Sequence, residues 1–569
     1  MRSGAEALAD ALADCGVRCI FGLPGTQNVP LYEAVRRRRI RSVLATHELA
    51  ASFMANGYHR AGGGLPALFA IPGPGFTYAL TGVAEARHDS AALLLVVGKV
   101  EASRPFAFQA LDQESVARPL VKGAISIERA GEVPGRVREA CELAVGGEPG
   151  PVLLQWSPEG VAAEAAPAAP VPEARRAPPA EAPLAVAAAR LAAARRPLLL
   201  VGQGASDSAE LVVALAEALS APVATTTSGR GIVPEDHPLA VGFDSARGET
   251  RTLNELVELA DAVLVLGCKL TAAGTADFAL QLPRERLIRV DASAEVLAAG
   301  YPAECAIHGA VADVLPGLVA AARRSRGAGG WPLPEVQAWR RRLRDLDPSR
   351  NPEPLVQGVE PRTAAAFFAA LRAALPRDGI LVLDSGLHQA LARRHFDVLS
   401  PRGLLLPSDF QSMGYALPAA IGARLAAPHR PVVALLGDGG FLMSGMEMLT
   451  AVRERVDLTV IVFNDGYLNR IRLQQFLSYG RPANVDILNP DYEAFAGAVG
   501  ARYAVLEGDA AAVLADAVRG QGVSLLEVRL GDSPAIRRAR GKGLVHGAAR
   551  RSGVGELLRR LRAATGKTR

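Results

Sequence analysis

Short, continuously apolar segments alternate with alanine-rich segments of helical periodicity along most of this 569-residue chain. Strands that are apolar at every position are typical of parallel sheets, because helices cover both faces of such a sheet. The clearest apolar segments are residues 91–96, 197–201, 262–266, 431–436 and 458–463. This alternation predicts doubly wound α/β domains, in which crossover helices pack on a parallel sheet.

The length of the chain exceeds what one hydrophobic core usually organises, so we expect several domains. Two seams rich in Pro, Ala, Arg or Gly divide the chain into thirds. The expected units are an N-terminal domain (1–164), a linker (165–182), a central domain (183–323), a second linker (324–358), a C-terminal domain (359–534) and a tail (535–569).

The tail carries a net charge of +10, whereas the rest of the chain is net negative. It contains 11 Lys or Arg residues against one acid, Glu556, whereas the formal charge of the whole chain is only +5. A solvated chain end is the simplest interpretation of such a segment. Binding of an acidic partner, nucleic acid or an anionic membrane is the alternative.

The N-terminal residues lack the basic start and apolar run of a signal peptide, and no uncharged apolar run of 18 residues predicts a membrane span. The five cysteines are scattered and odd in number, which does not suit a disulfide framework. We therefore expect reduced cysteines and a cytoplasmic protein.

A glycine-rich turn with one acid follows the predicted strand 431–436. Its sequence is Gly437-Asp438-Gly439-Gly440, and Asn464 stands at the end of the next strand, 26 residues past Asp438. Ligands of open α/β sheets bind beyond the carboxyl ends of the strands. Backbone N–H groups at a helix start suit phosphate oxygens, and a carboxylate with an amide oxygen suits Mg²⁺. Gly-Asp-Gly alone also forms ordinary turns, so the prediction depends on its pairing with Asn464.

These two segments resemble the thiamine-diphosphate enzyme family that includes acetolactate synthase, pyruvate decarboxylase and benzoylformate decarboxylase. The family signature is Gly-Asp-Gly, some two dozen residues, and then an Asn pair. Here Phe463 replaces the first Asn of the pair, and Asn464 is the second. The resemblance implies that Asp438, Asn464 and the carbonyl of Gly466 hold a magnesium ion.

His47-Glu48 precedes a predicted helix that ends in Gly57-Tyr58-His59-Arg60. By itself, a Glu at a helix start is usually a capping or solvated acid. The family has a His-Glu at this point, followed by a helix that ends in Gly-Tyr-x-Arg. The resemblance therefore implies that Glu48 is the carboxyl group that stabilises the imino tautomer of the cofactor's aminopyrimidine ring, which then removes the thiazolium proton.

Further matches to the family cover nearly the whole chain. They include residues 20–25, 73–75, 107–109, 384–389 and 413–422. The resemblance implies that His388 and Gln389 approach the diphosphate and that Met413 is the apolar wedge that bends the cofactor. Besides Glu48 and the three metal ligands, the expected cofactor-binding residues are Pro24, Gly25, Gly73, Gly386, His388, Gln389, Ser412, Met413, Gly437, Gly439, Gly440, Tyr467 and Leu468.

The central third resembles the family's central domain through Gly202-Gln203-Gly204 and residues 225–231. Flavin-containing acetolactate synthases have an Arg-Phe-Asp-Asp-Arg segment after the strand that corresponds to 263–267. This chain has Cys268-Lys269-Leu270-Thr271-Ala272 instead. We therefore favour a central domain that is empty or differently occupied, with bound FAD as the alternative.

The family's members share decarboxylation of a 2-oxo acid to an enamine and then diverge. Decarboxylases protonate the enamine, commonly with histidines, whereas carboligases admit a second carbonyl compound. The chain has nine histidines but no adjacent pair, and none in the Ile71-Pro72 approach to Gly73. Gln109 matches the acetolactate synthase pattern and is the candidate that orients the enamine or the acceptor. The leading hypothesis is a carboligase; the alternatives are a 2-oxo acid decarboxylase and a non-catalytic cofactor-binding regulatory subunit.

Asn469-Arg470 replaces the small residue and methionine usual in the synthase substrate channel. Arg470 is expected either to bind an acceptor's carboxylate or to point to solvent. The resemblance also implies at least a two-fold dimer, with Glu48 of one chain facing Asp438 of the other. Whether a tetramer forms stays open, as do the donor and acceptor substrates.

Overall fold

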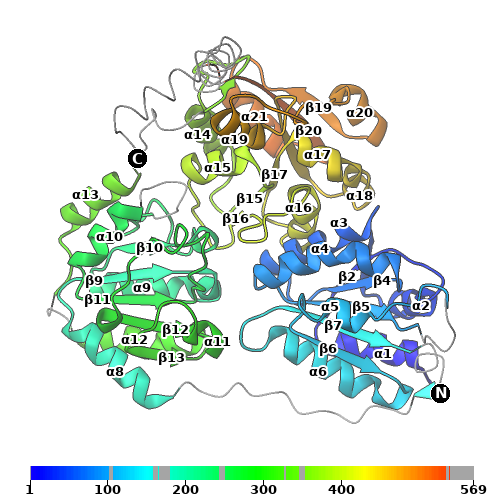
Figure 1. Cartoon of the computed structure of the whole chain (residues 1–569), viewed down its shortest axis with the longest axis horizontal. Helices are drawn as coiled ribbons and strands as arrows, with labels where there is room; N and C mark the ends of the chain where they lie inside the picture. Colours follow the sequence, from blue (N-terminus) through cyan, green and yellow to red (C-terminus); the bar gives the residue numbers. More distant parts are fainter. Residues whose placement is uncertain are drawn as a thin grey trace, which may run out of the picture.

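The computed structural model describes residues 2–100, 107–157, 164–165, 180–242, 250–325, 329–344, 353–532 and 537. It forms three α/β units, each built on a mainly parallel sheet (Figure 1). The predicted fold class is therefore confirmed. The basic tail lies outside the described residues apart from Arg537.

The N-terminal unit has a six-stranded parallel sheet in the order β3-β2-β4-β5-β7-β6. Side chains of α1, α2 and α6 share a core with one face, and those of α3 and α4 share a core with the other. The bounds are β2 Cys19–Gly22, β3 Arg41–Leu44, β4 Ala67–Ala70, β5 Leu93–Gly98, β6 Gly123–Ile127, β7 Pro151–Trp156, α1 Gly4–Asp14, α2 Val29–Arg38, α3 Glu48–Arg60, α4 Pro74–His88, α5 Gln113–Ala117 and α6 Val133–Val145. A short antiparallel pair, β1 (Arg2–Ser3) with β8 (Glu164–Ala165), joins the two ends of this unit.

The central unit has a five-stranded parallel sheet in the order β10-β9-β11-β12-β13. Its strands are apolar and buried along most of their length, as the sequence pattern predicts. The bounds are β9 Pro197–Val201, β10 Val223–Thr225, β11 Ala262–Leu266, β12 Leu287–Asp291, β13 Cys305–His308, α8 Glu181–Ala193, α9 Ala209–Leu219, α10 Thr250–Leu259, α11 Ala294–Ala298, α12 Val311–Arg324 and α13 Leu333–Arg344.

The C-terminal unit has a sheet in the order β14-β20-β18-β17-β15-β16, with β19 paired to β20. All pairs are parallel except β14, which runs antiparallel to β20. The bounds are β14 Leu355–Val356, β15 Ile380–Leu383, β16 Leu404–Leu405, β17 Val432–Gly437, β18 Leu458–Asn464, β19 Arg502–Val505, β20 Val523–Gly531, α14 Ala364–Ala374, α15 Leu387–His395, α16 Ala416–Ala426, α17 Asp438–Ser444, α18 Met448–Arg453, α19 Asn469–Tyr479, α20 Tyr492–Val499 and α21 Ala510–Arg519.

The helical segment that follows the glycine-rich turn is interrupted. The structure has α17, then a 3-10 turn over Gly445–Glu447, then α18. The ring of Phe441 packs against the backbone of Gly445, where a Cβ atom would lie 2.9 Å from the ring. The missing side chain makes room for this contact, and the chain changes direction there.

Helices α3 and α16 join the N-terminal and C-terminal units in backbone contact (Figure 1). A Cβ atom on Gly57 would lie 2.1 Å from the carbonyl oxygen of Ala419, and one on Gly422 would lie 1.9 Å from that of Met54. Apolar residues of both units form one continuous buried cluster around these helices. The two units therefore share part of a core.

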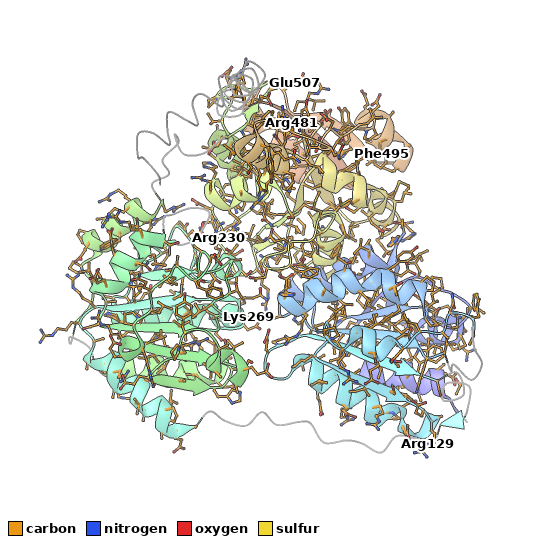
Figure 2. All side chains as sticks on the ribbon, viewed as in Figure 1. Arg129, Arg230, Lys269, Arg481, Phe495 and Glu507 are labelled. Atoms are coloured by element: carbon orange, nitrogen blue, oxygen red, sulfur yellow. The ribbon has the colours of Figure 1, made fainter. Side chains whose placement is uncertain are left out.

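The central unit is held to the other two by ion pairs and hydrogen bonds. Lys269 lies beside the N-terminal unit (Figure 2), where its ammonium group is 2.6 Å from a Glu148 carboxylate oxygen. The buried Arg230 guanidinium pairs with Glu235 at 2.6 Å and donates to the carbonyl of Phe396 in the C-terminal unit.

All five cysteines carry free thiols, as the sequence predicts. Within the part of the chain that the structure describes, no helix is long and apolar enough to cross a membrane.

A polar cluster is buried where α3 and α4 meet the C-terminal unit. Arg60 Nη1 donates to Asp89 Oδ2 at 2.7 Å, and Glu85 Oε2 accepts a hydrogen bond from the Ser412 amide at 3.0 Å. Burial, together with the nearby charge of Asp89, raises the pKa of Glu85 to about 7. The charged form of Glu85 therefore opposes folding at neutral pH.

We predict that Glu85→Gln changes how stability depends on pH. Folding raises the pKa of Glu85 above its ordinary value of 4.5, so the folded state binds this proton more tightly. The wild-type free energy of unfolding should therefore fall, by up to about 3 kcal/mol, as the pH rises from 4.5 to above 7. Relative to wild type, Glu85→Gln should gain stability over that window in urea denaturation. The exposed Glu139→Gln serves as control, and a pH-independent difference for Glu85→Gln would contradict the prediction.

Candidate functional site

Strands β17 and β18 end side by side at one edge of the C-terminal sheet, with Gly437 paired in register with Phe463. A cavity of about 500 Å³ opens there. Of the sequence-predicted residues, the cavity is lined by Gly386, His388, Gln389, Met413, Gly437, Asp438, Gly439, Gly440, Tyr467 and Leu468. Asn464, Gly466 and Ser412 do not line it. Gly466 donates its amide to Asp438, Asn464 shares the Asn489 donor with Asp438, and Ser412 directly precedes Met413.

The side-chain oxygens of Asp438 and Asn464 converge on one hydrogen-bond donor. Asn489 Nδ2 lies 2.9 Å from Asp438 Oδ2 and 2.8 Å from Asn464 Oδ1. Asp438 Oδ2 also accepts the Gly466 amide at 2.7 Å. The loop after β18 is thereby tied to the start of α17, and two oxygen atoms are held close together.

Glu527 determines which atom of the Asn464 amide faces Asp438. Asn464 Nδ2 donates to Glu527 Oε1 at 2.7 Å, and the Tyr503 hydroxyl donates to Glu527 Oε2 at 2.6 Å. Burial works against the charge on Glu527, but hydrogen bonds from Tyr503, Asn464 and Arg529 keep the pKa of Glu527 below its ordinary value. A carboxylate only accepts hydrogen bonds, so the NH₂ group must face it and Oδ1 faces Asp438.

Sequence reasoning missed Glu527 and Asn489. Glu527 is an acid within the apolar strand β20, in register with Val462 of β18, so an isolated acid in a buried strand was the available signal. Asn489 reaches the site from a loop, and no local pattern marks it.

Phe463, which stands where the family has its first Asn, contributes to the lining of the cavity, but its ring also belongs to the core. Its buried ring packs on Phe367 at a centroid distance of 5.1 Å. Successive residues of a strand face opposite sides, so the ring occupies the core while Asn464 turns to the cavity edge.

His388 lies beneath the glycine turn. A Cβ atom on Gly437 would lie 3.2 Å from its Nδ1 atom. Burial lowers the pKa of His388 to about 4, so the ring is neutral at physiological pH. Among the described residues, its Nε2 atom has no hydrogen-bond partner. Gln389 instead donates to the carbonyl of Pro407 at 3.2 Å.

The glycine turn also meets apolar side chains. A Cβ atom on Gly439 would lie 2.7 Å from Leu468 Cδ2 and 3.5 Å from Met413 Cε. One on Gly440 would lie 3.0 Å from the carboxyl carbon of Asp384. The absence of side chains leaves a cradle at the start of α17, with Met413 and Leu468 on its apolar side, a form suited to an anionic group with an attached ring.

The expected carbonyl ligand Gly466 has a left-handed backbone conformation, with φ 72°. Its carbonyl oxygen accepts the Ile487 amide at 2.9 Å. A carbonyl oxygen has two lone pairs, so this bond leaves one for a second partner. Tyr467, the next residue, lies under the guanidinium of Arg472 at 3.7 Å.

The predicted residues of the N-terminal unit form a second group. Glu48 begins α3 with 9% of its surface exposed, and its Oε1 atom lies 2.9 Å from where a Cβ atom on Gly75 would be. Gln109 Oε1 accepts from Gln27 Nε2 at 2.5 Å, and its Cβ atom lies 3.2 Å from the Cβ position of Gly73. Gly25 donates to Asn28 Oδ1 at 2.7 Å, directly after Pro24.

This second group does not line the cavity at Asp438. Within one chain, the residues predicted to bind the metal and the diphosphate lie together, and Glu48 lies with Gly73 and Gln109. The two groups remain separate half-sites.

A larger cavity, of about 950 Å³, lies at the carboxyl ends of the central strands and faces the other two units. Cys268, Lys269 and Asp291 line it, and it shares Arg393, Ser408 and Asp409 with the smaller cavity. Cys268 is buried, and its thiol would meet a Cβ atom on Gly202 at 2.7 Å. This edge of the sheet is where doubly wound domains usually bind ligands.

In the residues that the structure describes, no cluster of three His, Cys, Asp or Glu side chains could hold a metal. The Asp438 site contains one carboxylate facing an amide oxygen. Such a donor set suits a hard cation that also takes oxygens from a bound ligand.

Known protein families match successive parts of this chain. Three family models match it in order: the N-terminal TPP binding domain of thiamine pyrophosphate enzymes over residues 2–116, their central domain over 184–318, and their C-terminal TPP binding domain over 384–528. The C-terminal match includes the Asp438 half-site, and the N-terminal match includes Glu48.

Relatives match over most of their own length. The chain is 32% identical to the acetolactate synthase isozyme 1 large subunit of Escherichia coli, over 84% of each chain. It is 30% identical to a probable acetolactate synthase large subunit of Methanocaldococcus jannaschii, over 88% of this chain and 86% of the relative. It is 32% identical to a probable 2-ketoarginine decarboxylase of Pseudomonas aeruginosa, over 87% and 88%.

We predict that Gly439→Ala weakens binding of thiamine diphosphate about tenfold or more. The new methyl group would lie 2.7 Å from Leu468 Cδ2, so Leu468 must shift within the cavity that it lines. Gly497→Ala in α20 is the matched control, because no atom lies within 4 Å of its Cβ position. Titration calorimetry with the magnesium cofactor measures both variants, and equal affinity for Gly439→Ala and wild type would contradict the prediction.

Proposed function

Because this chain belongs to the thiamine pyrophosphate enzyme family, we propose that it is a carboligase of the acetolactate synthase type. It decarboxylates a 2-oxo acid such as pyruvate and joins the remaining unit to a second carbonyl compound. The convergence of Asp438 and Asn464 oxygens beside the glycine cradle is the observation that carries the cofactor assignment. Bound thiamine diphosphate supplies the electron sink for decarboxylation.

Asp438, Asn464 and the carbonyl of Gly466 are proposed to hold Mg²⁺. Two features support this. Asn489 Nδ2 marks the point where the first two oxygens converge, and a cation there would take the place of that NH₂ group. In addition, burial and the charge of Asp438 raise the pKa of Asp465 to about 7, and a cation at this edge would stabilise the charged forms of both carboxyl groups.

The other predicted residues, in the cradle and in the N-terminal unit, are assigned to binding, orientation and proton transfer. The neutral His388 ring donates a hydrogen bond toward the diphosphate, together with backbone N–H groups at the start of α17. Met413 supports the cofactor ring from the apolar side of the cradle. Glu48 holds a proton at the aminopyrimidine and is the catalytic acid–base group. Gln109, beside Gly73, orients the acceptor.

Carboligation is favoured over simple decarboxylation by the side chains around the cavity. Of the residues that line it, His388 is the sole histidine, and the low pKa of His388 makes it a poor proton donor at neutral pH. A cavity without a cationic histidine protonates the decarboxylated unit more slowly, which leaves time for a second carbonyl compound to react.

The second candidate is a 2-oxo acid decarboxylase that releases an aldehyde. Similarity to the probable 2-ketoarginine decarboxylase supports it, because that relative matches about as well as the synthases do. A non-catalytic regulatory subunit is not favoured, since Glu48, Asp438 and Asn464 are all retained.

A pair of chains is proposed to complete the site. An apolar stripe on α17, the 3-10 turn and α18 is exposed: Leu442 by 50%, Met443 by 57%, Met446 by 53% and Leu449 by 38%. Exposed apolar surface of this kind marks an interface. The stripe starts beside Asp438 and adjoins the N-terminal unit, where Glu447 accepts the Thr46 amide at 3.0 Å. Two-fold pairing over it would bring Glu48 of one chain to Asp438 of the other.

The central cavity is proposed to work without FAD. The chain lacks the Arg-Phe-Asp-Asp-Arg segment, and Lys269, in the corresponding stretch, is already bound to Glu148 and to the carbonyl of His88 at 2.8 Å. A cytoplasmic location and an acidic partner for the basic tail stay predictions.

With pyruvate, Mg²⁺ and thiamine diphosphate, the purified protein should form acetolactate rather than acetaldehyde. Glu48→Gln should lower turnover at least about 100-fold, because the ring loses its acid–base partner, while cofactor binding stays largely intact. Glu33→Gln, an exposed carboxylate of the same unit, is the control. Acetaldehyde as the main product would favour the decarboxylase, and an active Glu48→Gln would contradict the mechanism.

Co-expression of Glu48→Gln with Asp438→Asn tests whether two chains share the site. Each variant alone should be inactive. In a mixed dimer, one site receives a wild-type Glu48 and a wild-type Asp438, so activity should recover to about one quarter of wild type on random pairing. If both groups act within one chain, co-expression restores nothing. Two differently tagged copies of Glu48→Gln provide the control.

A further inference from the structure

The segment that carries Met413 to the cavity, residues 406–415, is anchored largely by the N-terminal unit of the same chain; we call it the Met413 segment. Arg60 Nη1 donates to the carbonyl of Leu406 at 2.7 Å and to the Tyr415 hydroxyl at 3.1 Å. The remaining anchors are the Ser408 hydroxyl, which donates to Asp89 Oδ1 at 3.2 Å, the Ser412 amide, which donates to Glu85 Oε2 at 3.0 Å, and the Tyr415 hydroxyl, which donates to Asn56 Oδ1 at 2.8 Å.

The C-terminal unit holds the other side of this segment. Asp384 accepts the amides of Gly414 at 3.0 Å and Ala416 at 2.9 Å. Met413 thus lies between an amide bound to Glu85 and an amide bound to Asp384. One carboxylate comes from each unit.

The backbone around Met413 needs such support. Gln411 has a left-handed conformation with φ 64°, which is uncommon for a residue with a side chain, and Gly414 has φ 76°. A turn of this kind persists when its surroundings over-determine it, and such turns are concentrated at ligand sites. Loss of one anchor should therefore alter the path of the two residues between Gln411 and Gly414.

Burying the Glu85 carboxyl group costs free energy. Its side chain is fully buried, and its Oε1 atom has no hydrogen-bond partner among the described residues. Asp89, a second buried carboxyl group, lies one helical turn along α4, and Arg60 is the cation that faces the pair. Stability alone would favour a neutral side chain here, because a buried carboxylate with an unsatisfied oxygen costs free energy. Groups kept under such conditions are concentrated at functional sites.

We infer that Glu85 is a positioning residue: its carboxylate fixes the Ser412 amide and thereby sets where Met413 meets the cofactor. This inference rests on the proposed role of Met413. The N-terminal unit would then contribute to two sites. Glu48 would act in the site of the partner chain, and Glu85 acts on the site of its own chain. A charged acceptor binds an amide more strongly than a neutral one, so at a pH above the Glu85 pKa of about 7, Glu85→Gln should loosen the contact without removing side-chain volume.

Hydrogen exchange of the cofactor-free protein tests the contact itself. In Glu85→Gln, the Ser412 amide should exchange about tenfold faster than in wild type. The control is Glu235→Gln, which alters an equally buried carboxylate that accepts the Val398 amide at 3.0 Å and does not touch the Met413 segment. Unchanged exchange at Ser412 in Glu85→Gln would overturn the inference, whatever reaction the protein catalyses.

Turnover in a double-mutant cycle tests the route through Met413. Glu85→Gln should lower kcat about tenfold with KM within about twofold of wild type, and in a Met413→Ala background it should lower kcat less than about twofold. A purely structural role would give the same loss in both backgrounds, together with lower stability, and would overturn the inference. If wild type has no thiamine-dependent turnover, the proposed function fails, and the exchange result still decides the role of Glu85.

Discussion

The hydrogen bond between Asn464 Nδ2 and the Glu527 carboxylate determines the chemical character of the site. It joins the neighbouring strands β18 and β20 of the C-terminal sheet. Because Glu527 accepts only, the amide presents its oxygen to Asp438. Without this contact the same Asn could present either atom, and a pair of oxygens for a cation would not be specified. The partly buried Tyr503–Glu527 contact supports the arrangement from a third strand.

The joint between α3 and α16 determines a second property. The glycines Gly57 and Gly422 bring the two helices into backbone contact, so the N-terminal and C-terminal units of one chain pack directly against each other. In that relation Glu48 and Asp438 belong to separate half-sites. The exposed stripe on α17 and α18 offers a surface for a second chain, and the buried cluster at Glu85 connects the same joint to the Met413 segment. Assembly and cofactor geometry are thus proposed to depend on one interface.

Much of the fold was predictable because parallel strands are apolar along their whole length. The segments at 197–201, 262–266 and 458–463 are strands in the structure, and the three-unit architecture follows from them. The family was predictable from Gly437-Asp438-Gly439 with Asn464, and the comparisons confirm it. The antiparallel strand β14 and the turn at Gly445 were not foreseen, because they depend on tertiary contacts. Asn489 and Glu85 were missed for the same reason: each acts through partners far away in the sequence.

The central claim is that Asp438 and Asn464 form a cation site with the cofactor. Anomalous diffraction from crystals grown with Mn²⁺ and thiamine diphosphate tests it directly, since Mn²⁺ accepts the same oxygen ligands as Mg²⁺. We expect one strong peak coordinated by Asp438 Oδ2, Asn464 Oδ1 and the Gly466 carbonyl, with Asn489 turned away. A peak elsewhere, or thiamine diphosphate bound without a metal at Asp438, would contradict the account.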